Sequence, residues 1–431
     1  MSCFDLPFGL AQCIAVAKPW LELIVGFFGI STFALVSYLT WVLGHLRDAN
    51  VGAVQDKEKA VRERDKFASD LENKNMELGA VKYQLDICTS SKNGDVSELG
   101  QKLQAALTEN SHLQARLSLV RSMTTDGDAS FWSRPPQQNR RDREYELRLS
   151  SSIPIVLFAN QKGGVGKSTL TTNLGAAFAD MNERVLVVDL DYQGTTSAQM
   201  IRHADLKLGM DLSRVDQLLL EKLRDRWESE ILQVHQNLYL IPADYNLETL
   251  ERREEYRWAL DESPDDVRYR LARALLSDHV RNTYSMVLID APPRMTLGFL
   301  NGFCASTHLF VPTVVDAASA RAVGRFAQQF KRLVPSINPR IEFAGIIGTM
   351  TNGGPVLPRV NEGIANMAEQ QARRELGENS NLFMRDAVMS RSAPLAAGTD
   401  SGIAFWQAPE TQTMFNAIAK SILARVRRTE P

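Results

Sequence analysis

The feature that most restricts the fold of this chain is a glycine-rich loop between an apolar run and a helical pattern. Residues 153–159 read IPIVLFA and have strand character, and NQKGGVGKSTLTTNLGAAFA follows at once, beginning as a loop and continuing as a helix. Strand, loop and helix in this order are the context that a phosphate-binding loop requires. The sequence therefore predicts an α/β fold with a phosphate site at the start of that helix.

The residue types in this loop suit phosphate oxygens and a magnesium ion. Gly163, Gly164 and Gly166 allow the backbone to wrap closely around phosphates, and the loop N–H groups and helix N-terminus supply positive potential. Lys167 is placed to reach the β- and γ-phosphates, and the Ser168 hydroxyl can ligate Mg2+. The alternative is a surface Gly/Lys loop without a ligand, and the flanking strand and helix count against it.

A second lysine inside the loop restricts the type of phosphate-binding loop that the sequence predicts. Gln161 stands where the ordinary GxxxxGK[ST] pattern has its first glycine, and Lys162 follows it. The run KGGVGKS at 162–168 resembles the deviant Walker A motif, KGGxGK[ST], of the ParA/MinD family of ATPases. RVLVVDLDYQG at 184–194 is similar to that family's second strand and switch I, and YSMVLIDAPP at 284–293 is similar to its Walker B strand and switch II.

Further segments extend the resemblance. IPADYNLETLE, VPTVVDAASARAV and AGIIGTMTN stand where the family pattern has comparable segments. The similarity covers residues 152–428, roughly two thirds of the chain. Three motifs in the family's order make this similarity specific.

The resemblance implies ATP and Mg2+ as cofactors and a role for individual residues. Lys162 would be the signature lysine, which crosses a nucleotide-sandwich dimer to contact the partner's ATP, and Lys167 would bind phosphates. Asp191 would orient the attacking water, and Asp290 would hold Mg2+, with Asp189 assisting in the same metal shell. The implied metal ligands are Ser168, Asp189 and Asp290, and the implied nucleotide-binding residues are Gly163, Gly164, Val165, Gly166, Lys167, Ser168 and Thr169. These roles agree with phosphoryl-transfer chemistry, which depends mainly on positioning and charge neutralisation.

One departure from the family pattern affects switch I. Tyr192 occupies a place where many ParA proteins have proline. We therefore expect switch I to move or to couple differently in this chain. Adenine contacts are expected around Thr349–Asn352.

The expected fold is a doubly wound, mostly parallel α/β sheet that occupies residues 152–431. Apolar runs alternate with helical patterns such as Ala317–Leu333 and Thr411–Arg425, as in other folds of this class. The expected strands begin near residues 153, 185, 238, 285, 307 and 343.

A long charge-free run lies near the start of the chain. Residues 23–43 read LIVGFFGISTFALVSYLTWVL, long enough at ~1.5 Å per residue to cross a ~30 Å hydrocarbon core. Trp20 and Trp41 lie near its ends, where aromatic rings favour the membrane interface. The run predicts a transmembrane helix at 21–43 after a short tail at 1–20; a buried core helix and a cleaved signal peptide are the alternatives.

The charges that flank this run predict its orientation. Lys18 precedes it, and the basic residues Arg47, Lys57, Lys59, Arg62 and Arg64 follow it. Positive flanks stay in the cytoplasm. We therefore expect a single-pass protein of the bacterial inner membrane with a cytoplasmic ATPase domain.

Residues 44–123 predict a coiled coil. Their seam positions alternate spacings of four and three, first at Phe67, Leu71, Lys74, Leu78, Val81 and Leu85, and then at Val96, Leu99, Leu103, Ala106, Asn110, Leu113, Leu117 and Val120. The polar run Thr89–Asp95 is either a break in one stalk or the turn of a helical hairpin. Lys74 and Asn110 either select the register or oligomeric state, or lie in water where the seams fray.

Residues 124–151 predict a linker, because they contain Gly127 and the adjacent Pro135 and Pro136. A cluster of arginines in this stretch comprises Arg140, Arg141, Arg143 and Arg148, and Asp142, Glu144 and Glu146 dilute their charge. A solvated hinge is therefore expected, with contact to anionic lipid or nucleic acid as the alternative.

Composition excludes several other classes of protein. With 431 residues, 44% of them hydrophobic, and a formal net charge of -2, the chain is neither disordered nor basic overall. The cysteines are Cys3, Cys13, Cys88 and Cys304. Their wide separation argues against a disulfide framework or a zinc site, and favours a reducing compartment.

The leading functional hypothesis is a membrane-tethered ATP switch, in which ATP closes a dimer that recruits or positions a partner and slow hydrolysis resets it. A bacterial tyrosine autokinase is one alternative, although the C-terminal residues SILARVRRTEP contain no tyrosine. A coiled-coil scaffold whose nucleotide-binding domain is nearly inactive is another.

The expected partners are a second copy of the chain, through the ATP sandwich and the coiled coil, the membrane, and an unidentified protein or cargo. Nonspecific DNA is also a candidate. The arginines that would serve it are Arg373, Arg374, Arg385, Arg391, Arg425, Arg427 and Arg428. A solvated helical face explains most of these charges equally well.

Overall fold

The computed structural model describes a large C-terminal part of the chain and a few residues before it. The described residues are 143–204, 215–219, 227–243, 246–259, 263–377, 381–396 and 402–427, with 69, 73, 76, 104–105, 107–111, 114 and 132. The chain divides into two compact units, residues 1–117 and 118–431. The second unit contains the predicted ATPase domain.

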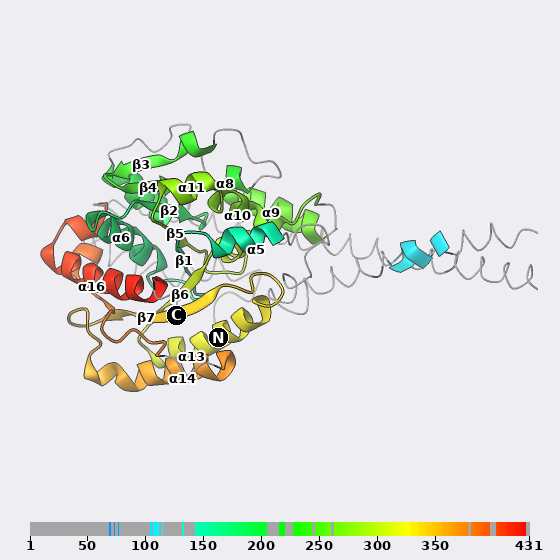
Figure 1. Cartoon of the computed structure of the whole chain (residues 1–431). Helices are drawn as coiled ribbons and strands as arrows, with labels where there is room; N and C mark the ends of the chain where they lie inside the picture. The colour runs from blue at the N-terminus through cyan, green and yellow to red at the C-terminus, as the bar shows by residue number, and fades with distance from the viewer. Residues whose placement is uncertain are drawn as a thin grey trace, which may run out of the picture. The chain divides into compact units, whose positions relative to one another are not determined.

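The described residues of the second unit form an eight-stranded sheet in the order β3-β4-β2-β5-β1-β6-β7-β8. Figure 1 labels the strands from β3 to β7 in this order. The strands of this sheet are β1 Ile155–Phe158, β2 Val185–Asp189, β3 Leu232–His235, β4 Leu238–Ile241, β5 Met286–Asp290, β6 His308–Val314, β7 Glu342–Thr351 and β8 Met389–Ser390. Neighbouring strands are parallel except for β3 and β4, which pair antiparallel. This confirms the predicted doubly wound, mostly parallel sheet.

The six predicted strands correspond to β1, β2, β4, β5, β6 and β7. The two strands at the edges of the sheet were not predicted. β3 reads LQVH and alternates exposed and buried side chains, and β8 has two residues. Neither carries the apolar run that marks a central strand buried on both faces.

Helices cover both faces of the sheet. They are α5 Arg143–Ser150, α6 Lys167–Asp180, α7 Thr195–His203, α8 Val215–Leu218, α9 Asn246–Ala259, α10 Arg270–Leu275, α11 Asp278–Thr283, α12 Leu297–Ala305, α13 Ala317–Leu333, α14 Glu362–Leu376 and α16 Pro409–Val426. Short 3-10 turns lie at η1 Trp227–Glu230, η2 Val267–Tyr269, η3 Arg359–Asn361 and η4 Ala404–Trp406. Figure 1 shows α6 and α16 packed side by side, and α13 beside α14.

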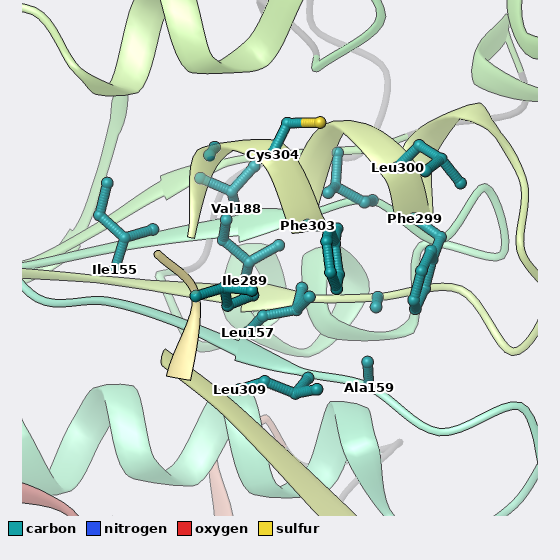
Figure 2. Close-up of a cluster of buried hydrophobic side chains, with 14 of the residues drawn as sticks. Ile155, Leu157, Ala159, Val188, Ile289, Phe299, Leu300, Phe303, Cys304 and Leu309 are labelled. Carbon is teal, nitrogen blue, oxygen red and sulfur yellow. The ribbon is translucent and has the colours of Figure 1, made fainter. Parts of the chain in front are cut away.

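Alternate residues of each central strand point to opposite faces, so the sheet has two hydrophobic cores. In β1, Ile155 and Leu157 join the core beneath α12 and α13, whereas Val156 and Phe158 join the core beneath α6 and α16. Figure 2 shows the first core, with Phe303 of α12 among the side chains that pack near Leu157. Burial on both faces explains the continuous apolar runs of these strands.

The predicted inner-membrane location has to be corrected. Nowhere in the described part of the chain is a helix both long enough and apolar enough to cross a membrane. The longest described helix, α16, has 18 residues and includes Glu410, Lys420 and Arg425, whereas a span requires about 20 predominantly apolar residues. The predicted span at 21–43 lies outside the described residues. The membrane location and the membrane partner are therefore not retained.

Most of the predicted coiled coil at 44–123 also lies outside the described residues. The described positions between Ser69 and Gln114 are helical. Asn110, a predicted polar seam position, is buried, with 6% of its surface exposed. The coiled coil itself stays a prediction.

The predicted linker at 124–151 contains two parts that pack on the ATPase domain. α5 lies within it, and Leu149 of this helix is buried. Tyr145 donates a hydrogen bond to the carbonyl oxygen of Cys304, at the end of α12. Trp132 is also buried. These described residues therefore do not form a solvated hinge.

Candidate nucleotide-binding site

The candidate site lies at one edge of the parallel sheet, where the carboxyl ends of β1, β2, β5, β6 and β7 meet. Registers place Asp189, the last residue of β2, beside Asp290, the last residue of β5. Asp290 also pairs in register with Phe158, which ends β1 just before the glycine-rich loop. Ligands of open α/β sheets bind outside the carboxyl ends of the strands. The topology therefore brings the three predicted motifs together.

The glycine-rich loop has the backbone conformation that its sequence predicts. Gly164 and Gly166 have φ values of +69° and +87°, which side chains other than glycine rarely adopt. A Cβ atom on Gly163 or Gly164 would meet no atom of the described residues within 4 Å, so the loop presents open backbone to them. Asn160 fixes the start of the loop, because its amide donates to the Pro312 carbonyl oxygen at 2.7 Å and its Oδ1 accepts from the Lys162 N–H at 2.9 Å.

Side chains from β7 and β8 support the far side of this loop. The Thr349 hydroxyl donates to the carbonyl oxygen of Val165 at 2.9 Å. A Cβ atom on Gly166 would lie 2.6 Å from the terminal methyl of Met389. Thr349 was predicted to lie near adenine, and the structure places its side chain beneath the phosphate loop, where it holds the loop in place.

Lys167 is the buried cation of the site. It begins α6, and 7% of its surface is exposed. Its Nζ lies 3.5 Å from the Lys162 carbonyl oxygen. Burial lowers the pKa of Lys167, and the negative charges of Asp290 and Asp191 oppose that shift. Further negative charge, such as a polyphosphate would supply, would stabilise the charged form of this buried ammonium group.

Ser168 and Thr169 follow Lys167 in the first turn of α6, as predicted. The Ser168 hydroxyl interacts with the Asp290 carboxyl as a hydrogen-bond donor. This interaction lowers the pKa of Asp290 and so opposes the effect of burial. The Thr169 carbonyl oxygen accepts a hydrogen bond from Asn173, one turn further along the helix. Ser168 therefore lies on the side of the helix that the predicted metal role requires.

Asp189 and Asp290 form a fully buried pair of carboxyl groups. Burial and the charge of Asp290 raise the pKa of Asp189. Burial also raises the pKa of Asp290, whereas the hydroxyls of Ser168 and Thr196 and the charge of Lys167 lower it. Two buried carboxylates side by side are unfavourable without a cation, so the pair fits a site for a divalent ion.

The two carboxyl groups differ in their hydrogen bonds. Asp189 accepts hydrogen bonds from switch I and from α7: Oδ1 accepts from the Asp191 N–H at 3.1 Å, and Oδ2 accepts from the Ser197 N–H and hydroxyl at 2.9 and 2.7 Å. Asp290 Oδ2 accepts from the Thr196 hydroxyl at 2.8 Å, whereas its buried Oδ1 has no hydrogen-bond partner among the described residues. An unpaired buried carboxylate oxygen fits a metal-bound water or a metal. Asp290 is therefore the better candidate for the metal shell, and Asp189 positions switch I.

Asp191 lies near the start of the loop after β2, close enough to Lys167 to interact with its charge. Its Oδ1 accepts a hydrogen bond from the Gln193 N–H at 3.1 Å. Burial raises the pKa of Asp191, and the Gln193 N–H and the charge of Lys167 oppose this rise. The structure thus brings the predicted water-orienting carboxylate to the same site as the phosphate loop.

Lys162 is held by its own subunit in this conformation. Its Nζ donates to the Ser319 hydroxyl at 2.7 Å and lies 3.6 Å from Asp316 Oδ2. Asp316 is the N-cap of α13 and accepts from the Ser319 N–H at 2.7 Å. The lysine and aspartate side chains are 41% and 43% exposed. An ion pair this exposed contributes about 0–1 kcal/mol, so Lys162 can leave it at little cost.

Glu251 of α9 is a functional candidate that sequence reasoning missed. It accepts hydrogen bonds from the Thr296 hydroxyl at 2.6 Å and from the Gly298 N–H, at the start of α12. Burial, followed by the charge of Asp191, raises its pKa to about 7, although both hydrogen bonds oppose the rise. The carboxyl group joins α9 to the segment that follows Asp290. A single Glu on a charged helix carries no signal for this contact in the sequence.

Several arginines that were candidates for DNA contact bind within the chain. Arg385 pairs with Glu362 and Glu369, Arg373 pairs with Glu369, Arg427 pairs with Glu183, and Arg425 donates to the Ala344 and Asn381 carbonyl oxygens. Four of the seven therefore have partners within the chain, although the side chains of Arg427 and Arg373 are 51% and 37% exposed. Arg428 lies outside the described residues.

A mostly parallel sheet with a glycine-rich loop between β1 and α6, and carboxylates at the ends of β2 and β5, defines a phosphate-loop nucleotide-binding protein. The AAA domain family matches residues 153–343. The chain is 31% identical to the chromosome partitioning protein ParA of Caulobacter vibrioides, over 59% of this chain and 86% of that protein. It is 32% identical to the chromosome-partitioning ATPase Soj of Treponema pallidum, over 45% of this chain and 70% of that protein. The chain belongs to the ParA family.

Two solved structures are also similar. A cobyrinic acid a,c-diamide synthase from Mycobacterium smegmatis, with bound ATP analog and magnesium, aligns with a TM-score of 0.49 at 23% identity, over 64% of this chain and 97% of that one. A plasmid partition protein from Borrelia burgdorferi bound to AMPPNP aligns with a TM-score of 0.47 at 18% identity, over 63% and 99%.

Proposed function

We propose that this protein is an ATP-dependent dimerisation switch that recruits or positions a partner or cargo and is reset by slow ATP hydrolysis. In this proposal Mg-ATP binds at the edge of the sheet and closes two subunits face to face. The closed form binds the partner, and hydrolysis reopens the dimer. Membership of the ParA family supports the proposal, because its relatives are named as partitioning proteins and as an ATPase.

The observation that carries the proposal is the presence of two lysines with different environments on one phosphate loop. Lys167 is buried between the loop and the carboxylates of Asp290 and Asp191. The Lys162 side chain is 41% exposed, and it is held by a hydrogen bond to the Ser319 hydroxyl and by an exposed pair with Asp316. A phosphate loop that served its own nucleotide alone would need only Lys167. An exposed second lysine fits a role across a dimer, where the partner's ATP supplies the negative charge.

The remaining site residues take the following roles in this proposal. Loop N–H groups from Gly163 to Thr169 and the Lys167 ammonium hold the phosphates. Ser168 and Asp290 hold Mg2+, which supplies charge neutralisation at the phosphate oxygens. Asp189 orders switch I through the Asp191 N–H and holds the start of α7 through Ser197, and Asp191 orients the attacking water.

Two substitutions separate binding from hydrolysis. Lys167→Ala should lose Mg-ATP, because the main cationic partner of the β- and γ-phosphates is gone. Asp191→Ala should retain ATP and accumulate the dimer, because the phosphate cradle is intact while phosphate release falls by roughly 100-fold or more. Nucleotide affinity, phosphate release and molecular mass measured together check these outcomes. Equal ATP affinity in the two variants would contradict the assigned roles.

The partner is identified by its effect on turnover. We propose that the coiled coil at 44–123 adds a second contact between subunits and that a protein or cargo binds the closed form. Nonspecific DNA is tested in the same assay. Phosphate release with and without DNA and candidate proteins shows which of them stimulates the ATPase.

A further inference from the structure

A tryptophan from the chain that precedes the ATPase domain is built into that domain. Trp132 is 2% exposed, and its indole Nε1 donates a hydrogen bond to the Met295 carbonyl oxygen at 3.0 Å. Its ring stacks on Trp258 of α9, with 6.2 Å between centroids and 23° between planes. A tryptophan side chain buries roughly 150–250 Å². The contact is therefore a specific attachment of a segment 21 positions before the first residue of the matched AAA domain (153 − 132 = 21).

A buried charge completes the binding site for this tryptophan. The Arg268 guanidinium, which is fully buried, donates to the Trp132 carbonyl oxygen at 2.7 Å. It also pairs with Asp266 at 2.6 Å and lies over the Trp258 ring, 4.6 Å from its centroid. Both the backbone and the side chain of Trp132 are thus held. Burial of an arginine lowers the stability of a fold unless the guanidinium group is paired. The partners of Arg268 include the carbonyl oxygen of Trp132 in the attached segment.

The carbonyl that accepts the indole N–H belongs to the segment that leads away from the nucleotide site. β5 ends at Asp290, and Met295 lies five positions later, directly before the N-cap residue Thr296 of α12. The next hydrogen bonds of this segment go to Glu251, from Thr296 and Gly298. Residues 291–296 are therefore anchored at one end by the candidate metal ligand and at the other by Trp132 and Glu251.

We propose that the Trp258–Arg268–Met295 site is an intramolecular docking site for Trp132, through which the N-terminal part of the chain and the nucleotide site regulate each other. The proposal rests on the proposed function, because it requires that Mg-ATP changes the position of residues 291–296. A shift of Met295 lengthens or shortens the hydrogen bond to the indole. By linkage, the factor by which bound nucleotide changes the docking equilibrium of Trp132 equals the factor by which docking of Trp132 changes nucleotide affinity.

Variants of the full chain test the coupling. Trp132→Phe keeps an aromatic ring for Trp258 but has no N–H for Met295, and Trp132→Ala removes both contacts. Tyr145→Phe is the matched control: it removes a hydrogen bond from the same segment to Cys304, at the other end of α12. The affinity for a non-hydrolysable ATP analogue with Mg2+ is measured for each, together with hydrogen exchange at residues 291–298 with and without the nucleotide.

We expect Trp132→Phe to change nucleotide affinity by about fivefold or more, with altered exchange at residues 291–298, and Tyr145→Phe to leave both as in the wild type. Wild-type affinity and exchange in Trp132→Phe would overturn the proposal, leaving Trp132 as a structural anchor. If Trp132→Ala does not fold, Trp132→Phe still decides. A wild-type chain that binds no nucleotide would instead refute the proposed function, so the two failures are distinguishable.

Discussion

At the scale of the residue, Lys162 distinguishes a dimer switch from an ordinary nucleotide-binding site. Lys162→Ala should leave ATP binding intact, because Lys167 and the loop N–H groups remain, but should abolish ATP-dependent dimerisation. Its effect on folding stability should stay within about 1 kcal/mol, because the pair with Asp316 is exposed. Light scattering with Mg2+ and a non-hydrolysable ATP analogue measures the dimer.

The fragment and the control for this experiment follow from the structure. Residues 118–431 form one compact unit and retain Trp132 and α5, whereas a fragment that began at Ser152 would lack both. Asp316→Asn keeps an oxygen to cap α13 and weakens the hold on Lys162, so it should dimerise at least as well as the wild type. Equal dimerisation of Lys162→Ala and the wild type would place the action of Lys162 within its own subunit.

Glu251 gives a second prediction at this scale, for pH dependence. Its pKa rises from 4.5 to about 7 in the folded chain, so the folded state binds more protons than the unfolded state between these values. Its contribution to stability is therefore lost as pH rises from about 4.5 to about 7. Glu251→Gln should gain stability relative to the wild type across this window, by up to about 3 kcal/mol. Urea denaturation at several pH values measures this difference.

The control for Glu251 is another carboxyl of the same helix. Glu248 is 46% exposed and pairs with Arg252. Glu248→Gln should show a small difference from the wild type that does not grow across the same pH window. A constant difference for Glu251→Gln as well would show that Glu251 does not bind the extra proton.

At the scale of the element, alanine substitutions at two helical glycines should have opposite effects on the stability of the fold. A Cβ on Gly302 of α12 would lie 2.9 and 3.0 Å from methyl groups of Leu190 and Leu157. Gly302→Ala should therefore overpack the core and lower the free energy of unfolding by about 1–3 kcal/mol. The roughly 1 kcal/mol gain in helix propensity offsets this in part. In the part of the chain that the structure describes, no atom lies within 4 Å of such a Cβ on Gly363 of α14, and Gly363→Ala should stabilise the fold by up to about 1 kcal/mol. Thermal unfolding gives the order, and a Gly302→Ala variant more stable than Gly363→Ala would contradict this packing.

The elements also show which local signals are reliable. α13 begins at Ala317 and ends at Leu333, as the sequence predicts, because Asp316 caps it and its apolar residues repeat at helical spacing. β3 and β8 were missed because a short edge strand is specified by its neighbour's hydrogen bonds rather than by its own residues. Local patterns thus predict long buried elements and fail at edges.

At the scale of the whole molecule, the predicted coiled coil has a consequence for assembly. If seams at 44–123 pack between chains, the full chain should be a dimer or larger without nucleotide, while residues 118–431 should be monomeric until Mg-ATP is added. Sedimentation of both at equal concentration measures this. A monomeric full chain would favour the intramolecular helical hairpin.

The class of the fold and the composition of the phosphate site follow from local sequence patterns. The loop at 160–169, the switch segments and the six buried strands are contiguous runs, and their residue types satisfy local requirements of backbone angle, burial and phosphate charge. Each such signal lies within about 20 positions. The predicted residues Lys167, Asp191 and Asp290 therefore arrive at one site once the parallel order of the strands is known.

Contacts between residues far apart in the chain could not be predicted from such local patterns. Trp132 bonds to Met295 across 163 positions, and Lys162 bonds to Ser319 across 157. The sheet register sets Asp189 beside Asp290. Residues of α7 donate hydrogen bonds to both carboxyl groups, whereas Oδ1 of Asp290 has no partner within the described part of the chain. Such contacts depend on the packing of whole elements, because a side chain's partners, burial and pKa come from neighbours that its local sequence does not specify.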